Sequence, residues 1–401
     1  MDKIIKSKQN HPGYRFAVLI LMVLIAGFSQ GMLLPLLAIM LEQAGVSSSL
    51  NGLNAAALYI GILLISPFIE KPVRKYGYKP VITIGLILII VSLLLFPFWQ
   101  VFWFWFILRM IVGIGDNMVH FATQVWITST SPISKRGRNI SLYGLAFGLG
   151  FSAGPFMTRL LSINEYLPFI IASIFSLISY VFVLFLKNEW PENDLETAKQ
   201  TGTWGRYKQV IKLAWFALLP GFCYGFLEAS IHGNYPVYAL RSGITIEWVS
   251  ILLPAFVIGG LITQLPLGLL SDKWGRRKLL LTVTFFGSLS FFSMIFVEQS
   301  IILLLLFFTL SGALVGSLFS LGVMYLTDLL PKNLLPTGNV MTAVSFGLGS
   351  ILGPLTGGIL IDVMESGSIY FAIGGILLFV FVLGIVFRED APATVKKAAT
   401  A

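Results

Sequence analysis

The chain contains little charge, little histidine and a single cysteine. Of its 401 residues, 11% are charged and three are histidine, whereas 56% are hydrophobic. One cysteine, Cys223, excludes an intramolecular disulfide and a cysteine-based zinc site. The sequence contains no G-x-x-x-x-G-K-[ST] loop and no H-E-x-x-H. We therefore expect no direct use of ATP, no enzymatic activity, no cofactor and no metal site.

Long apolar runs take the place of charge. The mean hydropathy is +0.87, and apolar runs near the roughly 20 residues that cross a bilayer recur along the whole chain. The first run lacks a signal-peptide cleavage site and is expected to remain as a span. Helices satisfy their own backbone in lipid, so the runs predict an all-α membrane protein. The twelve predicted spans are 14–40, 50–69, 79–99, 101–127, 140–162, 166–186, 208–239, 246–270, 277–296, 299–327, 338–361 and 368–387.

The basic residues predict an orientation in the membrane. The net charge of +9 would suit a nucleic-acid partner, but all except three of the 27 Lys and Arg lie in the termini and alternate loops. The exceptions are Arg159 and Arg241 in the other loops and Arg109 within a span. Positive charge collects on the cytoplasmic side of membrane proteins. We expect a multi-pass protein of the cell membrane, with both termini in the cytoplasm and no nucleic-acid partner.

The chain divides into two similar halves. A polar stretch separates six spans from six and predicts an N-terminal bundle (1–186), a cytoplasmic linker (187–207) and a C-terminal bundle (208–401). FGLGFSAGP at 147–155 resembles FGLGSILGP at 346–354, and GFSQG at 27–31 resembles GFCYG at 221–225. Repeats of this kind are typical of transporters that bind substrate between their halves.

Three ionisable residues lie within the fourth span. At about 100° per residue, Arg109, Asp116 and His120 share one helix face. Because buried charge is costly in a membrane, this face is expected to point into the protein or toward water. Asp116 and His120 are one turn apart and can form a proton acceptor. A static buried ion pair remains an alternative.

The seventh span repeats this arrangement. Glu228 and His232 are again one turn apart, between Tyr224 and Tyr235 on roughly the same face. Proline and glycine interrupt the span, and broken helices at membrane depth usually line cavities. Further polar residues would either contact a substrate or bind neighbouring helices: Gln30, Asn54, Asn117 and Asn234.

The turn after the eighth span resembles a signature of the major facilitator superfamily, G-x-x-x-D-[RK]-x-G-[RK]-[RK]. The matching residues are Gly268, Asp272, Lys273, Gly275, Arg276 and Arg277. The resemblance implies a gating contact through Asp272, although a basic loop that only sets topology remains an alternative. After the second span Gly77 is kept, but Arg74 replaces the acidic residue. The sequence leaves open whether this turn takes part in gating and whether Glu70 substitutes for the missing acidic residue.

Two further motifs resemble those of proton-coupled efflux members. Arg109, Gly113 and Gly115 follow the pattern R-x-x-x-G-x-G, which implies a role for Arg109 in proton coupling. The antiporter pattern G-x-x-x-G-P-x-x-G-G is partial in the fifth span and complete in the eleventh. Its small residues are also explained by close helix packing alone. They are Gly150, Gly154 and Pro155, and Gly349, Gly353 and Pro354.

The resemblance implies the fold of that superfamily, two bundles of six helices, with spans 1, 4, 7 and 10 around a central cavity. Within that superfamily, the sequence is similar to the small bacterial drug:proton antiporters and the YcaD-like group. We therefore expect a monomer that exports a small amphipathic or cationic compound in exchange for protons. Asp116 and His120 depart from the family pattern, so their proposed role rests on helix geometry alone. The alternatives are a metabolite or sugar symporter or facilitator, a glycolipid flippase, and a membrane sensor without transport.

Overall fold

The computed structural model describes residues 12–191, 203–364 and 366–387. These residues form helices and their connections, without a β-strand. Among them, twelve helices are long and apolar enough to cross a membrane, which confirms the predicted spans. Most of the predicted linker, and the ends of the chain beyond 12 and 387, lie outside the described residues.

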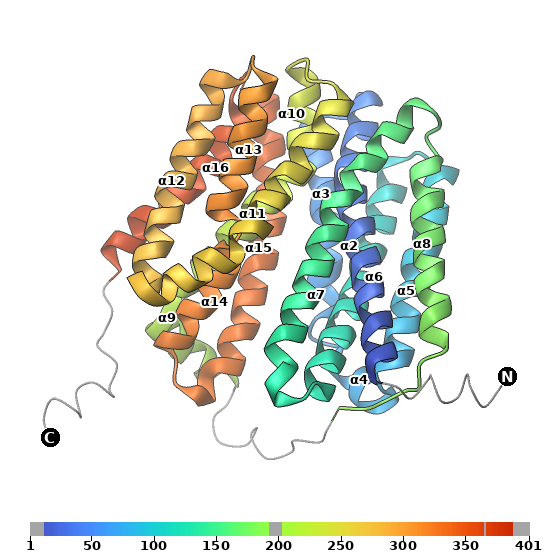
Figure 1. Cartoon of the computed structure of the whole chain (residues 1–401). Coiled ribbons are helices and arrows are strands. Elements are labelled where there is room, and N and C mark those ends of the chain that lie inside the picture. The colour runs from blue at the N-terminus through green and yellow to red at the C-terminus, as the bar shows by residue number, and fades with distance from the viewer. Residues whose placement is uncertain (1–11, 192–202, 365, 388–401) are drawn as a thin grey trace, which may run out of the picture.

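The N-terminal half contains six of the spanning helices (Figure 1). They are α2 (Pro12–Gln43), α3 (Ser48–Ile65), α5 (Tyr78–Leu95), α6 (Phe102–Thr130), α7 (Ile133–Ala153) and α8 (Leu167–Leu184). Shorter elements join or extend them: α4 (Glu70–Tyr76), η1 (Phe96–Phe98) and η2 (Gly154–Ser162).

The C-terminal half contains the other six spans, one of them built from two helices. Its long helices are α9 (Thr203–Gly233), α11 (Ile246–Trp274), α12 (Arg276–Val297), α13 (Ile301–Val315), α14 (Leu318–Leu329), α15 (Leu335–Val363) and α16 (Ser368–Val386). Its short helices are α10 (Tyr235–Arg241) and η3 (Lys332–Leu334). α13 and α14 together form the tenth span.

Each half is built around a hydrophobic core of its own. Close approach of the first and fifth spans stabilises both halves in the same way. A Cβ on Gly150 would lie 1.9 Å from the carbonyl oxygen of Leu24, and a Cβ on Gly349 would lie 2.0 Å from that of Phe222. Only glycine fits at such distances. The repeated FGLG segments therefore place α7 against α2 and α15 against α9.

The seventh span is interrupted at Gly233, just before Pro236 in the first turn of α10, but not at Pro220 or Gly225. α9 continues through Pro220 and Gly225, whereas Ala214 has non-helical backbone angles. The helix ends at Gly233, and α10 begins after Asn234. Neighbouring helices and side chains can satisfy the backbone groups that a proline frees, so a proline in a membrane helix need not end it.

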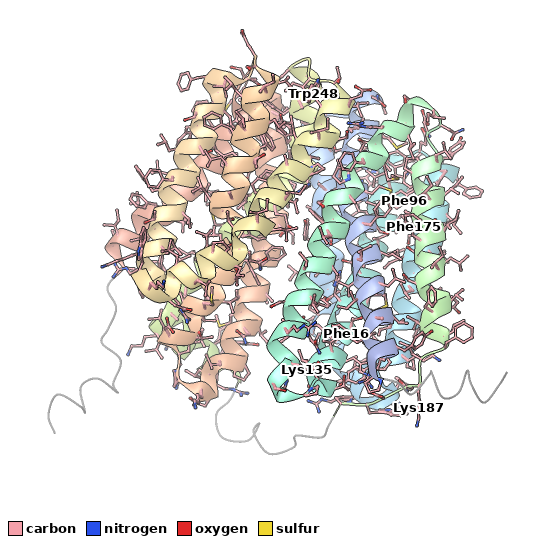
Figure 2. The ribbon with its side chains drawn as sticks, viewed as in Figure 1. Phe16, Phe96, Lys135, Phe175, Lys187 and Trp248 are labelled. Atoms are coloured by element: carbon pink, nitrogen blue, oxygen red, sulfur yellow. The ribbon has the colours of Figure 1, made fainter. Side chains whose placement is uncertain are left out.

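The two ends of the bundle differ in charge. We call the end where α2 begins and α16 ends the terminus side and the opposite end the far side (Figure 1). Figure 2 shows Lys135 and Lys187 at the terminus side and Trp248 at the far side. In Figure 1 the ribbons of the two halves converge at the far side and diverge toward the terminus side.

Candidate functional site

A cavity of about 460 Å³ lies between the two halves. Its size is within the range of sites that hold small organic ligands. Lysine and arginine are absent from its wall, which is made of described residues. The polar and charged side chains of the wall are Gln30, Tyr59, Asp116, Asn117, His120, Tyr143, Tyr224, Glu228, His232, Gln264 and Ser320. The phenylalanines of the wall are Phe147, Phe151, Phe256, Phe319 and Phe346.

Asp116 and His120 face the cavity from α6. Asp116 is buried, with its Oδ1 3.5 Å from Nε2 of His120. The other ring nitrogen, Nδ1, lies 2.6 Å from the hydroxyl of Tyr143 on α7. Sequence reasoning missed Tyr143, because its neighbour is on another helix and no periodicity fixes the register between two helices.

Arg109 shares the α6 stripe but does not line the cavity. Its side chain is fully buried, and Nη1 donates to Oδ1 of Asn54 on α3 at 2.8 Å. Nε and Nη2 find no hydrogen-bond acceptor among the described residues. The predicted polar stripe therefore divides into a cavity-facing pair and an arginine held between α3 and α6.

Glu228 and His232 face the same cavity from α9. Glu228 is half-buried, and His232 is fully buried. The ring of His232 packs on Phe151 of the N-terminal half, with centroids 4.6 Å apart. Neither ring nitrogen of His232 has a hydrogen-bond partner among the described residues. The structure thus brings both acid–histidine pairs to one cavity.

The remaining predicted cavity residues separate into two groups. Gln30, Asn117 and Tyr224 line the cavity, whereas Asn54, Asn234 and Tyr235 do not. Asn234 donates to the carbonyl oxygen of Pro354 at 3.1 Å, and Tyr235 packs on Phe308 in the C-terminal core. These three residues hold helices together.

The turn between α11 and α12 contains the signature motif. Gly275 has φ +92°, a conformation that glycine adopts without strain. Arg276 lies 3.4 Å from Asp272 and 3.1 Å from Asp328, and it also donates to the carbonyl oxygen of Met324. Arg277 donates to the carbonyl oxygen of Gly384 at 3.0 Å. The described contacts of this turn join helices within the C-terminal half.

The turn between α3 and α5 is held by residues outside the motif. Glu70 pairs locally with Arg74 at 2.8 Å. Beside Gly77, the backbone N–H of Tyr78 donates to the carbonyl oxygen of Glu189 at 2.9 Å. Asn188 accepts from the backbone of Lys79 at 3.0 Å.

The carboxylate of Glu189 joins two further helices at the terminus side. It accepts from Arg15 of α2 and from the indole of Trp126 of α6, at 2.5 and 2.8 Å. The sequence signal for this contact was slight: an Asn-Glu pair directly after the sixth span.

Hydrogen bonds and ion pairs join the halves at the far side. Arg241 of the C-terminal half binds Glu42 of α2 at 2.8 Å and lies 3.4 Å from Asp362. The hydrogen bond to Glu42 raises the pKa of the Arg241 guanidinium above its ordinary value. Asp362 also accepts from the backbone N–H groups of Ser48 and Ser49 at 3.0 and 2.8 Å. We call Glu42, Arg241 and Asp362 the far-side clasp.

Comparison with known proteins agrees with this architecture. The model of the Major Facilitator Superfamily matches residues 19–254 and 221–401. The uncharacterized MFS-type transporter YfkF of Bacillus subtilis is 49% identical, covering 90% of this chain and 92% of that protein. Multidrug resistance protein 1 of the same organism is 24% identical, covering 88% and 92%.

A solved structure shares the fold. It is a bacterial homolog of the human lysosomal transporter Spinster, in an inward-facing and unoccupied conformation. The TM-score is 0.76 at 12% identity, and the match covers 96% of this chain and 100% of that one. Both the family and this structural neighbour are transporters rather than enzymes. The chain is a multi-pass membrane transporter and belongs to the major facilitator superfamily.

Proposed function

We propose that this chain exports small amphipathic organic cations in exchange for protons, with both termini in the cytoplasm. The observation that carries the proposal is the charge of the cavity wall. It contains Asp116 and Glu228 but no lysine or arginine. Because the wall supplies no lysine or arginine to neutralise these carboxylates, a mobile cation can do so.

The aromatic wall supports an organic rather than a hydrated cation. Five phenylalanines and three tyrosines line the cavity. Aromatic faces attract cations and also bury apolar surface. A ligand with a delocalised positive charge and aromatic groups satisfies both features. The similarity to Multidrug resistance protein 1 is in keeping with such a substrate.

Proton exchange follows from competition for the same carboxylates. An acid in an apolar wall is costly to ionise, so it binds a proton when no cation is near. An arriving organic cation stabilises the ionised form and displaces that proton. Release of the cation to the far side then allows the carboxylates to take up protons again. The cycle couples proton entry to export.

The far-side clasp supports alternating access. It joins the halves at one end of the cavity through the Arg241–Glu42 pair and the hydrogen bonds from Ser48 and Ser49 to Asp362. These contacts must separate before a ligand can leave toward the far side. The described conformation is then the one that receives substrate from the terminus side. The contacts of Arg276 and Arg277 would keep the C-terminal half rigid as it moves.

The test is transport of tetraphenylphosphonium in proteoliposomes. We expect accumulation driven by an imposed proton gradient and abolished by a protonophore. Asp116→Asn and Glu228→Gln should each weaken proton-driven transport while leaving the melting temperature nearly unchanged, because both replacements preserve shape. Transport that ignores the proton gradient, or wild-type pH dependence in both variants, would contradict the proposal.

A further inference from the structure

Three side chains from two helices form a continuous polar chain along the cavity wall. Asp116 Oδ1 lies 3.5 Å from His120 Nε2, and His120 Nδ1 lies 2.6 Å from the Tyr143 hydroxyl. All three residues line the cavity. Resting on the proposed function, we propose that they form a proton relay in which the Tyr143 hydroxyl is the outlet for the proton of Asp116.

The first step of the relay runs along α6 toward the terminus side, and the second crosses to α7 at about the same depth. Asp116 lies four residues, about 6 Å, deeper along α6 than His120. His120 is ten residues from the end of α6, and Tyr143 is ten residues from the beginning of α7, both at the terminus side. The chain therefore runs from a buried acid toward the terminus side. Tyr143 lines the cavity, so water within the cavity is the acceptor that this outlet requires.

The chemistry balances without another reactant. Protonated Asp116 gives its proton to Nε2 of His120, Nδ1–H gives its proton to the phenol oxygen, and the phenol O–H gives its proton to water. One proton leaves Asp116 and one reaches solvent, while His120 returns to a neutral state with its other tautomer. At 3.5 Å the two groups form an ion-pair contact but no hydrogen bond, because Nε2 of His120 has no hydrogen-bond partner among the described residues. The first transfer therefore requires Asp116 and His120 to move closer together.

Packing holds the imidazole in this position. The ring of His120 meets the edge of Phe147 at 5.0 Å and of Tyr143 at 6.1 Å between centroids, both near perpendicular. Other titratable groups also face the cavity and contribute to the pH dependence: Tyr59 from α3, and Tyr224, Glu228 and His232 from α9. Arg109 on α6 adds a buried positive charge two turns from Asp116. Because several groups affect the pH dependence of proton release, the contacts between Asp116, His120 and Tyr143 identify the relay and the pH dependence alone does not.

Tyr143→Phe tests the outlet, because it removes the hydroxyl and keeps the ring. Stopped-flow mixing of the purified protein with tetraphenylphosphonium in weak buffer, with a pH indicator, measures proton release. We expect release to slow by about tenfold or more, with a shifted pH profile and with a smaller loss of ligand affinity than of release rate. Tyr180→Phe on α8 is the matched control and should release protons at the wild-type rate.

A second variant separates a relay from independent effects. If protons pass through both residues in series, His120→Gln/Tyr143→Phe should be no slower than His120→Gln alone. Multiplied slowing in the double variant, wild-type release in Tyr143→Phe, or a parallel loss of binding and release would overturn the relay. If the wild-type protein binds tetraphenylphosphonium without releasing protons, the proposed exchange fails as well. The two failures are therefore distinguishable.

Discussion

Arg109 places a positive charge inside the N-terminal half, and its guanidinium has one side-chain acceptor, Oδ1 of Asn54. The guanidinium is fully buried, and a buried charge without hydrogen bonds is strongly destabilising. The contact to Asn54 therefore has more effect on stability than a hydrogen bond at the surface. Arg109 lies between α3 and α6, away from the cavity. It therefore supplies a fixed positive charge and does not contact the ligand directly.

Asn54→Ala is expected to lower the free energy of unfolding by about 1–3 kcal/mol, because it leaves a buried charged donor without its acceptor. A fall in melting temperature of the purified protein measures the effect. Asn139→Ala removes a neutral contact to Ser131 near the beginning of α7. This control should cost at most about 1.5 kcal/mol. Equal losses of unfolding free energy in the two variants would show that the Arg109–Asn54 hydrogen bond contributes no more to stability than a neutral one.

The sequence predicts which residues share a helix face but not what they meet on other helices. Helical periodicity placed Asp116 and His120 together, and the structure has them on one face and in one cavity. Tyr143, Glu189 and Asp362 were missed, since their partners lie on different helices. Asn54 and Asn234 were expected near substrate, yet their hydrogen bonds go to other helices. Periodicity alone does not show which residue on another helix a polar side chain in a span contacts.

At the scale of helices, the repeated glycines determine how closely spans one and five approach. The α2–α7 contact in one half and the α9–α15 contact in the other use the same small-residue spacing. The apolar runs made all twelve spans predictable. The break at Ala214 and the division of the tenth span into α13 and α14 were not, because no proline or polar run marks either place.

Gly150→Ala should destabilise the N-terminal half by about 1–3 kcal/mol, because its Cβ would overlap the carbonyl oxygen of Leu24 and force α2 and α7 apart. Thermal unfolding measures the change. Gly137→Ala is a matched control on α7, where a Cβ meets nothing within 4 Å. It should be neutral or stabilising by up to about 1 kcal/mol. A Gly150→Ala protein as stable as wild type would refute the close contact.

For the whole molecule, the far-side clasp joins the two halves at one end. Its ion pairs are partly exposed, with Arg241 38% exposed, so each contributes little by itself. Asp362 adds hydrogen bonds from Ser48 and Ser49 at the beginning of α3, where a carboxylate is favoured. The combined contact holds the far side closed without preventing it from opening.

Arg241→Gln should shift the protein toward far-side opening by at most about 1 kcal/mol, roughly a fivefold change in the ratio of the two states. Spin labels at Leu50 and Val363, both exposed at the far side and on opposite halves, report the separation in a Cys223→Ser background. The longer distance should gain population. Arg74→Gln, which breaks a pair within one half, is the control and should leave the distances unchanged. An unaltered distribution in Arg241→Gln would mean that the clasp does not hold the halves.

The central claim is that a cation displaces a proton from the carboxylates of the cavity. Calorimetric titration with tetraphenylphosphonium, in buffers of different ionisation enthalpy, measures the protons released per cation bound. We expect release that fades as pH rises and the acids lose their protons before the ligand arrives. Asp116→Asn/Glu228→Gln should abolish it, and triphenylphosphine oxide, a neutral compound of similar shape, should bind without it. Binding of the cation with no proton release at any pH would contradict the account.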